Sequence, residues 1–407
     1  MAVATPTPTS TPTSTPTLTN ARRAAGRWLP LALVFLAVGL STAMSSPFLA
    51  LFLDEAVHAD AAHVAVFLAA APVSAVCIST LLAKVSDRLP VRRALLLATA
   101  LAGCAGTALT AVLRDYWALL VVTVTLTAAA AAMMPQVFAY AREALHGSQR
   151  VAMTMSSLRT LFSIAWVAGP PLAAVLLDAG GFPAVYGTAS LMYAVAALVV
   201  LTALRASPRP APQQAGAVRP GADAPRAVIW LTIVVFVLTR CAGALSVQSL
   251  SLFVTRELGG EVRDAGLLLG LCAGLEIPLM LGFGWLATRV PVHRLLLVGA
   301  ACGLAYTSLV SVATSTAVLV AGQLLNAASI AALTGLGVTY VQDMLPRHPG
   351  RASTLFTNTF PAGAVLAGPV LGLAQHAGYR MPYVVAAVLS AAALALLAVR
   401  RHGGKSA

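Results

Sequence analysis

Charged side chains inside long apolar segments are the residues of this chain best suited to do chemistry. Three occupy such positions, Arg159, Arg240 and Glu276. A charge at membrane depth is costly, so where one occurs it usually marks an ion or substrate pathway. Glu276 lies about twelve residues into its segment, roughly 18 Å along a helix and near the membrane midplane. A carboxyl there can take up a proton from one side and release it to the other. We therefore predict that Glu276 is a proton-coupling site.

The two arginines are predicted to be partners of this carboxyl or substrate contacts. Arg240 lies in the middle of its segment, where its guanidinium can hydrogen-bond the hydroxyls of a polyhydroxyl ligand or pair with Glu276. Arg159 lies only about seven residues from the inner end of its segment, so its side chain can instead extend to the membrane surface. A static ion pair between Glu276 and either arginine, which would only hold helices together, is the structural alternative.

Small residues in the segment of Glu276 predict which way this side chain faces. A glycine or proline recurs at every fourth position, at Gly266, Gly270, Gly274, Pro278 and Gly282. Such a stripe allows a neighbouring helix to approach closely. Glu276 is two positions from Gly274, about 200° around the helix. We therefore expect it to face away from the packed stripe and toward a central cavity.

Neutral polar residues on other apolar segments are candidates for the rest of a substrate site. They are the amides Gln136, Gln248, Asn326 and Asn358, with Trp166 and Phe356 as possible stacking surfaces. Amide side chains both donate and accept hydrogen bonds, which suits a ligand rich in hydroxyls. The alternative for each amide is a hydrogen bond between helices, which contributes about 0.6 kcal/mol on average.

The chain that carries these residues is built for a lipid environment. Hydrophobic residues make up 59% of it and charged residues 10%, whereas soluble domains carry about 25% charged residues. Apolar runs of about 20 residues, the length that spans a bilayer, predict an all-α membrane protein with twelve transmembrane helices. They are expected at residues 29–53, 61–83, 92–113, 117–140, 152–177, 184–204, 227–254, 264–287, 293–312, 316–341, 354–375 and 381–399.

The twelve predicted helices form two pseudo-symmetric halves. The segment 88–93 returns 201 residues later as 289–294, and the pair 169–170 returns 199 residues later as 368–369. Repeats of this length are typical of secondary transporters. We expect six-helix halves over residues 28–205 and 227–400, joined by a proline-rich linker over 206–226. A disordered Thr/Pro-rich cytoplasmic tail is expected over 1–27 and a short cytoplasmic tail over 401–407.

The loop between the second and third predicted helices is a candidate inner gate. It combines Asp87 with Arg88, Arg92 and Arg93. An acidic side chain among cations at a helix end can bind them in one conformer and release them in another. Helix capping, together with a purely topological role for the cations, is the alternative.

Two repeated Gly-Pro pairs are predicted to shape helices five and eleven. They are Gly169-Pro170 and Gly368-Pro369. Glycine permits close helix contact, and proline removes a backbone hydrogen bond and bends the helix. Bent helices at symmetric positions suit a rocking movement of the two halves.

The net charge of +13 is explained by membrane topology. With both termini inside, the inner loops and tails hold 20 of the 26 Lys and Arg residues. This asymmetry is the positive-inside pattern, which predicts cytoplasmic termini and argues against nucleic-acid binding. All five cysteines fall inside predicted helices without metal-ligand spacing, so neither a metal nor a cofactor is expected.

The sequence leaves two alternatives, a membrane enzyme and an exporter of a different class of ligand. Asp54-Glu55, after the first predicted helix, is where a membrane glycosyltransferase keeps acidic residues, but the outer loops are too short for an acceptor domain. A solvated helix end explains this pair more simply. An exporter of amphipathic drugs would have the same fold, although only 6% of residues are aromatic, which mildly favours a polar ligand.

Several stretches of the chain resemble the bacterial sugar efflux transporters of the major facilitator superfamily. They are residues 134–139, 141–143, 161–171, 274–278, 342–346 and 354–358. The candidate gate loop also resembles the superfamily signature Asp-Arg-x-Gly-Arg-Arg, with Pro90 in place of the usual glycine and one extra residue before Arg92. The resemblance implies export of sugars such as glucose, lactose and alkyl or thio-galactosides by proton antiport. It also implies a monomer in the bacterial inner membrane.

Overall fold

The computed structural model describes residues 18–89, 91–144, 151–204 and 222–399, and over these residues the chain is helical, with no strand. The first half comprises α1 (Leu18–Ser45), the 3-10 helix η1 (Ser46–Phe48), α2 (Leu49–Glu55), α3 (Ala61–Arg88), α4 (Arg92–Val112), α5 (Tyr116–Val122), the π-helical η2 (Thr123–Thr127), α6 (Ala128–Ala131), α7 (Met133–Ala144) and α8 (Val151–Thr202).

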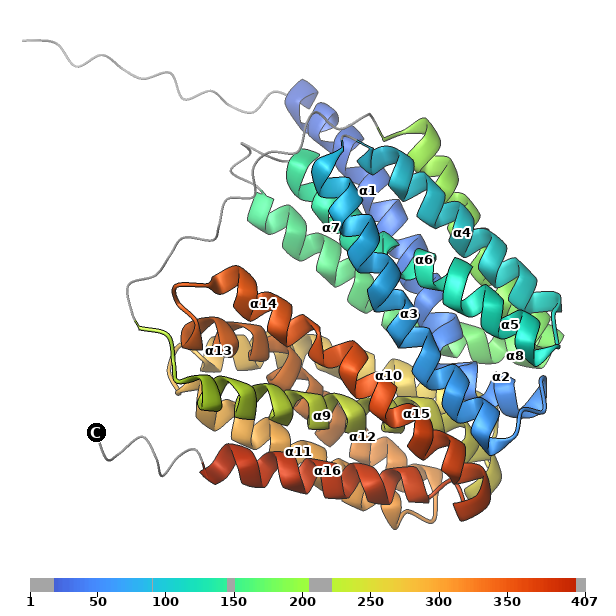
Figure 1. Ribbon diagram of the computed structural model, residues 1–407, viewed down its shortest axis with the longest axis vertical. Coiled ribbons are helices and arrows are strands. Elements are labelled where there is room, and N and C mark those ends of the chain that lie inside the picture. Colours follow the sequence, from blue (N-terminus) through green and yellow to red (C-terminus); the bar gives the residue numbers. More distant parts are fainter. Residues whose placement is uncertain (1–17, 90, 145–150, 205–221, 400–407) are drawn as a thin grey trace, which may run out of the picture.

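The second half repeats this pattern (Figure 1). It comprises α9 (Arg226–Leu252), the π-helical η3 (Phe253–Glu257), α10 (Val262–Leu286), α11 (Val292–Ser311), α12 (Thr316–Gly335), α13 (Gly337–Met344), α14 (Pro349–Thr357), α15 (Thr359–Ala377) and α16 (Met381–Val399). The predicted linker over 206–226 lies almost entirely outside the described residues, as do residues 1–17 and 401–407 of the predicted tails. Residues 18–27, predicted to be disordered, instead form the start of α1.

Ten helical stretches of the described residues are long and apolar enough to cross a membrane. One of them, residues 160–202, is two helices joined at Gly180 and Gly181, whose backbone angles are not helical. Gly181 has a φ of +66°, a conformation that glycine adopts without a steric penalty. Counting this stretch as two and adding the 19 residues of α15 gives twelve. The prediction of an all-α membrane fold is confirmed.

Local sequence explains where several of these helices begin. The Asp60 carboxylate accepts a hydrogen bond from the His63 amide at 2.8 Å and caps α3. Asp115 caps α5 in the same way through the Ala118 amide. α10 begins with a capping box between Glu261 and Asp264. Side-chain oxygens at these positions satisfy amides that have no partner within the helix.

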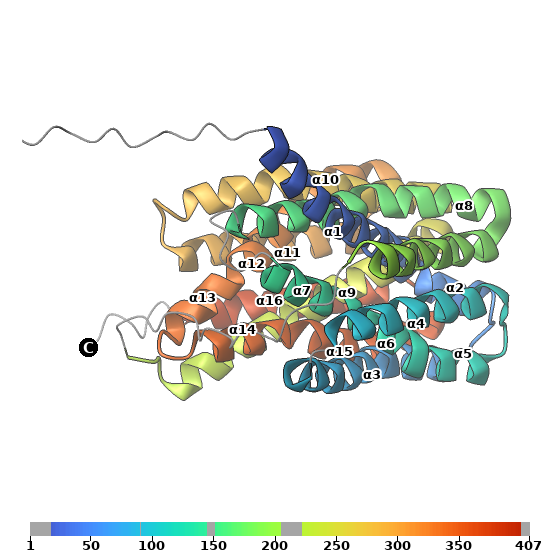
Figure 2. The ribbon, with the colours of Figure 1, turned by 90° about the horizontal axis from the view of Figure 1, so that it is seen from above.

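The bundle has two ends, which we call the near end and the far end. The near end holds the starts of α1 and α9 and the end of α16, while the far end holds the α2–α3 connection, η3 and the turn from α15 to α16 (Figure 1). The two halves meet mainly where α3 packs against α15 and α8 packs against α10. Figure 2 shows these two pairs on opposite sides of the molecule.

Close contact between the halves depends on glycines near the far end. A Cβ added to Gly368 would lie 2.9 Å from the Ala69 amide nitrogen of α3. A Cβ on Gly266 would lie 2.7 Å from the Pro170 carbonyl oxygen of α8. A methyl group at either position would meet backbone, which cannot move aside as a side chain can. These glycines therefore set the distance between the halves.

The hydrophobic core joins the halves at the same end. One cluster, which includes Phe48 and Phe52 of the first half and Leu245 and Leu371 of the second, lies around the far-end connections. The other clusters of the described residues belong each to one half. The structure is thus a conformer in which the far end is closed.

Candidate functional site

A cavity of about 440 Å³ lies between the halves and reaches into the second half. The second half supplies most of its lining, from α9, α10, α11, α12, α15 and α16, and the first half contributes Phe162, Ser163 and Trp166 of α8. Arg240, Glu276, Asn326 and Trp166, four of the residues predicted from sequence to form a site, line this cavity. Clefts of this size are typical of small-molecule sites.

Arg240 places an incompletely paired guanidinium at the cavity. Its Nη1 donates a hydrogen bond to the Thr334 hydroxyl at 2.8 Å. The guanidinium carbon lies 3.8 Å from the centre of the Phe360 ring, which fixes the plane of the group by stacking. Nε and Nη2 are buried and have no hydrogen-bond partner. A buried donor without a partner is unfavourable, so these two nitrogens are ready to bind a ligand acceptor.

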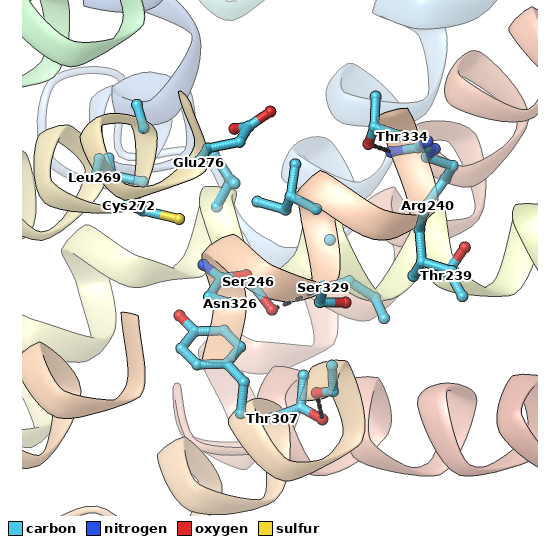
Figure 3. Close-up of a pocket in the computed structure, with 18 of the residues that line it drawn as sticks. Thr239, Arg240, Ser246, Leu269, Cys272, Glu276, Thr307, Asn326, Ser329 and Thr334 are labelled. Atoms are coloured by element: carbon cyan, nitrogen blue, oxygen red, sulfur yellow. Dashed lines mark hydrogen bonds between the residues drawn. The ribbon is translucent and has the colours of Figure 1, made fainter. Parts of the chain in front are cut away.

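Glu276 lies across the cavity from Arg240 (Figure 3). Both side chains belong to the described part of the chain, and the structure has no ion pair between them. The static ion pair of Glu276 with Arg240 is therefore absent from this conformer, whereas the side chain of Arg159, the other arginine considered from sequence, lies outside the described residues. Both groups instead line the cavity, Arg240 from α9 and Glu276 from α10.

The glycine stripe on α10 packs only in its first two turns. Gly266 and Gly270 contact α8, whereas a Cβ on Gly274 or Gly282 would meet nothing within 4 Å. α10 and α8 therefore diverge before Glu276. This divergence leaves room for the cavity beside the carboxyl.

Asn326 is held by a residue that sequence analysis did not single out. Its Nδ2 donates to the Gln323 Oε1 at 3.2 Å, and Gln323 is only 1% exposed. With this nitrogen engaged, Oδ1 of Asn326 is left as the acceptor that the residue can offer to the cavity.

Hydroxyl groups form a further part of the lining that sequence analysis missed. They include Thr239, Ser246, Thr307, Ser329 and Thr334. Serine and threonine are common in transmembrane helices, where their hydroxyls bond to their own backbone carbonyls. Thr307 does this, with a bond of 2.9 Å to the Gly303 oxygen. Their sequence positions alone gave no signal that they share a cavity.

Aromatic rings form the apolar walls. Phe162 and Trp166 on α8 have ring centres 6.5 Å apart. On the opposite half, Phe360 lies against Arg240, and Phe356 packs on Phe360 with ring centres 5.9 Å apart. Phe356 thus supports the wall indirectly, because it touches Arg240 and Phe360 without lining the cavity.

Three predicted amides do not line this cavity. Gln136 is 4% exposed on α7, in the first half, and Gln248 lies on α9. Asn358 is exposed at the junction of α14 and α15. Their predicted part in substrate binding stays a prediction.

The candidate gate loop is only partly described. The side chains of Asp87 and Arg88, like that of Arg159 on α8, lie outside the described part of the structure. Arg92 is buried and donates to the Ser86 hydroxyl at 2.9 Å. Arg93 donates to the carbonyl oxygen of Leu201 at the end of α8. These contacts connect α4 to other elements of the first half, and the gating role stays a prediction.

The Gly-Pro pairs lie within continuous helices. α8 and α15 remain helical through Gly169-Pro170 and Gly368-Pro369. A Cβ on Gly169 would lie 2.6 Å from the Ala43 Cβ of α1, so this glycine serves packing within the first half. Gly368 serves packing between the halves.

Metal binding is not supported by the described residues. They contain no group of three or more His, Cys, Asp or Glu side chains that could hold an ion. The cavity has instead a single carboxyl, a guanidinium, an amide and several hydroxyls. Such a set can bind a neutral polar molecule and exchange a proton.

Comparison with known proteins identifies the family. The Major Facilitator Superfamily model matches residues 31–316 and 250–407. This chain belongs to the major facilitator superfamily. It is 36% identical over 384 residues to a putative sugar efflux transporter of Deinococcus radiodurans, which covers 92% of this chain and 98% of that protein. It is 33% identical over 373 residues to sugar efflux transporter A of Dickeya chrysanthemi, covering 91% of this chain and 94% of that one.

Solved structures agree with the superfamily fold. A point mutant of the nucleoside transporter NupG superposes with a TM-score of 0.75 at 14% identity, over 91% of this chain and 98% of that one. The family model and the relatives confirm the family resemblance recognised from sequence. Membership of this superfamily makes the chain a multi-pass membrane transporter and disfavours the glycosyltransferase alternative.

Proposed function

We propose that this transporter exports sugars or glycosides from the cytoplasm in exchange for protons, by alternating access. Two relatives that match nearly the whole chain carry the names of sugar efflux transporters. The cavity offers a guanidinium, an amide oxygen and hydroxyls to a ligand rich in hydroxyl groups. Its aromatic walls suit the apolar face of a sugar ring.

The observation that carries the proposal is the pairing state of Arg240. Its Nε and Nη2 are buried without a partner, although most buried polar groups in proteins are hydrogen-bonded. A sugar hydroxyl or ring oxygen would complete these bonds. Glu276, on the opposite wall, would contact the same ligand from the other side (Figure 3).

Glu276 is the proposed coupling group. The ionised carboxylate accepts hydrogen bonds from sugar hydroxyls, and the protonated acid accepts fewer, so proton and sugar compete for one site. One proton moving inward down 100 mV releases about 2.3 kcal/mol, and a pH difference of one unit adds about 1.4 kcal/mol. Their sum sustains a gradient of several hundredfold for a neutral sugar, at about 1.4 kcal/mol per factor of ten.

The positive-inside pattern supports placing the near end in the cytoplasm. Both termini then lie on that side, in the inner membrane of a bacterium. The far end faces outward, and the conformer described here is closed to the outside. One chain supplies both sides of the cavity, so the proposed working unit is a monomer. Its proposed partners are a sugar and protons, and nucleic acid is not among them.

A drug exporter of the same fold is the second candidate. Much of the cavity wall is aliphatic or aromatic, including Leu269, Ile330 and Leu333. This composition also suits an amphipathic drug. The two candidate functions differ in the ligand that binds at Arg240, a sugar in the first and an amphipathic drug in the second.

The test is transport into inside-out vesicles that contain the protein, with an acid interior and a panel of labelled sugars. Uphill uptake of a sugar that a protonophore abolishes would support the proposal. Accumulation of a fluorescent drug without uptake of any sugar would replace the substrate class. Sugar uptake that ignores the proton gradient would remove the coupling.

A further inference from the structure

A single carboxylate at the far end receives hydrogen bonds from three parts of the opposite half. Asp54, in the last turn of α2, accepts from the Gln375 Nε2 at 3.1 Å and from the Tyr379 hydroxyl at 3.2 Å, both on Oδ1. Its Oδ2 accepts from the Arg256 Nη2 at 3.4 Å. The donors come from α15, from the turn before α16, and from the π-helical η3.

Further bonds hold these donors in place. Gln375 also donates to the Ala59 carbonyl oxygen at 3.0 Å, so it joins two points of the first half. The Tyr379 amide donates to the Glu257 Oε1 at 3.0 Å. Burial, with the neighbouring Asp54 carboxylate, raises the pKa of the Tyr379 hydroxyl to about 12. This hydroxyl therefore remains a donor at physiological pH.

The internal repeat explains why these groups meet. The pair Leu51-Phe52 returns 201 residues later as Leu252-Phe253, and the same offset relates Glu55 to Arg256. These two side chains are in contact, 3.4 Å from Glu55 Oε1 to Arg256 Nη2. Equivalent positions of the two halves thus face each other. Opposite charges at these positions attract, whereas a perfect repeat would place like charges together.

Where hydrogen bonds of this cluster cross between the halves, the acceptors all lie in one half and the donors in the other. The acceptors Asp54, Glu55 and Ala59 belong to the first half, and the donors Arg256, Gln375 and Tyr379 belong to the second. Every one of these bonds must break when the far ends separate. The sequence-based expectation that Asp54-Glu55 is a solvated helix end is corrected for Asp54, whose side chain is only 18% exposed and is bonded across the halves. The Glu55 side chain is 37% exposed, as expected.

The energetic weight falls on Asp54. An exposed ion pair such as Arg256 with Glu55 contributes little, since solvent screens it and its side chains must be ordered. A shielded carboxylate that accepts several hydrogen bonds is stronger, because bonds to a charged group are about twice as strong as neutral ones.

We propose that Asp54 is the hub of a polar lock that holds the far end closed, so that the charge of this carboxylate sets the balance between the two access states. The lock acts whatever the cargo and whether or not protons are exchanged. It therefore goes beyond the proposed function, and an experiment that contradicts one of the two proposals leaves the other unaffected.

The test measures the far-end opening directly in the full chain. Spin labels at positions 112 and 312, introduced as noncanonical residues so that the native cysteines stay, report the distance between the halves. Val112 is the last residue of α4, and Val312 directly follows α11. Both lie at the far end and are 71% exposed. The distance between the two labels is measured by pulsed electron-electron double resonance in lipid nanodiscs, without sugar and without a proton gradient. In the Asp54→Asn variant, the ratio of long to short distances is expected to rise at least tenfold.

Asp60→Asn is the matched control. Asp60 is also a far-end carboxylate, but its bonds in the structure go to His63 in its own half, and asparagine keeps the helix cap. Its distance distribution should equal that of the wild type. An Asp54→Asn distribution that also equals the wild type would overturn the proposal.

Single-donor variants make the test independent of how well Asp54→Asn folds. Tyr379→Phe and Gln375→Leu each remove one class of donor to Asp54. Each should shift the ratio in the same direction by less than Asp54→Asn does. A shift toward shorter distances in either variant would contradict a lock centred on Asp54. So would an unchanged distance distribution in both variants.

Discussion

Replacing Arg240 with methionine removes every donor of its guanidinium and keeps a long side chain. Two nitrogens, Nε and Nη2, have no hydrogen-bond partner within the protein and are the ones that a sugar would engage. A hydrogen bond to a charged group contributes about 1.5–3 kcal/mol. Loss of two such bonds therefore weakens sugar binding by roughly 3–6 kcal/mol, or about 10² to 10⁴-fold at 1.4 kcal/mol per factor of ten.

The stability of the protein should change in the opposite sense. Burying a donor without a partner is unfavourable, and the bond from Arg240 to Thr334 is the one hydrogen bond that would be lost. We expect the thermal unfolding midpoint of Arg240→Met to stay equal or rise. Arg240→Lys keeps the charge, but it loses the planar fork and the stacking on Phe360. Its affinity should fall between those of the wild type and Arg240→Met.

Sugar binding to the purified protein by calorimetry, together with thermal unfolding, measures both effects. Arg289→Met is the control, because Arg289 also stacks on an aromatic ring, that of Trp285 at 4.1 Å, but lies outside the cavity. A dissociation constant of Arg240→Met within threefold of the wild type would refute the assignment. So would an equal loss of affinity in Arg289→Met.

Three further predictions concern the cavity and the packing around it. Gly266→Ala places a Cβ against the Pro170 carbonyl oxygen and should lower the free energy of unfolding by about 1–3 kcal/mol. Gly274→Ala on the same helix meets open space, so its unfolding in a thermal assay should match the wild type, and equal effects of both would contradict the packing. Cys272 lines the cavity, so a transported sugar should slow its alkylation by N-ethylmaleimide, measured by mass spectrometry; an unchanged rate at saturating sugar would place the sugar elsewhere. Glu276→Gln should retain sugar exchange down a gradient and lose uphill uptake in acid-loaded inside-out vesicles; uphill uptake equal to that of the wild type would make Glu276 structural.

Sequence alone identified the charged residues of the cavity because a charge in an apolar helix has few acceptable surroundings. Arg240 and Glu276 both line the cavity, and the direction of Glu276 followed from the glycine stripe of its helix. The stripe itself was overextended, since Gly274 packs against nothing. Helix periodicity gives the face of a residue, but not where two helices begin to diverge.

Neutral polar residues were harder to place for a physical reason. An amide can be satisfied inside one half, between helices or at a helix end, and its residue type does not distinguish these surroundings. Asn326 lines the cavity, whereas Gln136 is buried in the first half and Asn358 is exposed. Only the structure identifies Thr334 as part of the site, because its hydroxyl accepts a hydrogen bond from Arg240.

The contacts between the halves could not be predicted from local patterns at all. Asp54 bonds to Gln375, which is 321 residues away in the chain. The repeat gave the equivalence of Glu55 and Arg256, but not that equivalent positions touch. Similarly, hydropathy separated the helices on either side of Gly180 and Gly181 only approximately, because the turn between them is short and apolar.

The measurement that tests the central claim most directly is the proton movement that accompanies sugar transport. Proteoliposomes with a pH-sensitive dye inside are given a sugar gradient, with the membrane potential clamped at zero. The account predicts that sugar moving in one direction drives protons in the other, and that Glu276→Gln still moves sugar but no longer moves protons. Sugar flux in the wild type without any change in internal pH, or undiminished proton flux in Glu276→Gln, would contradict it.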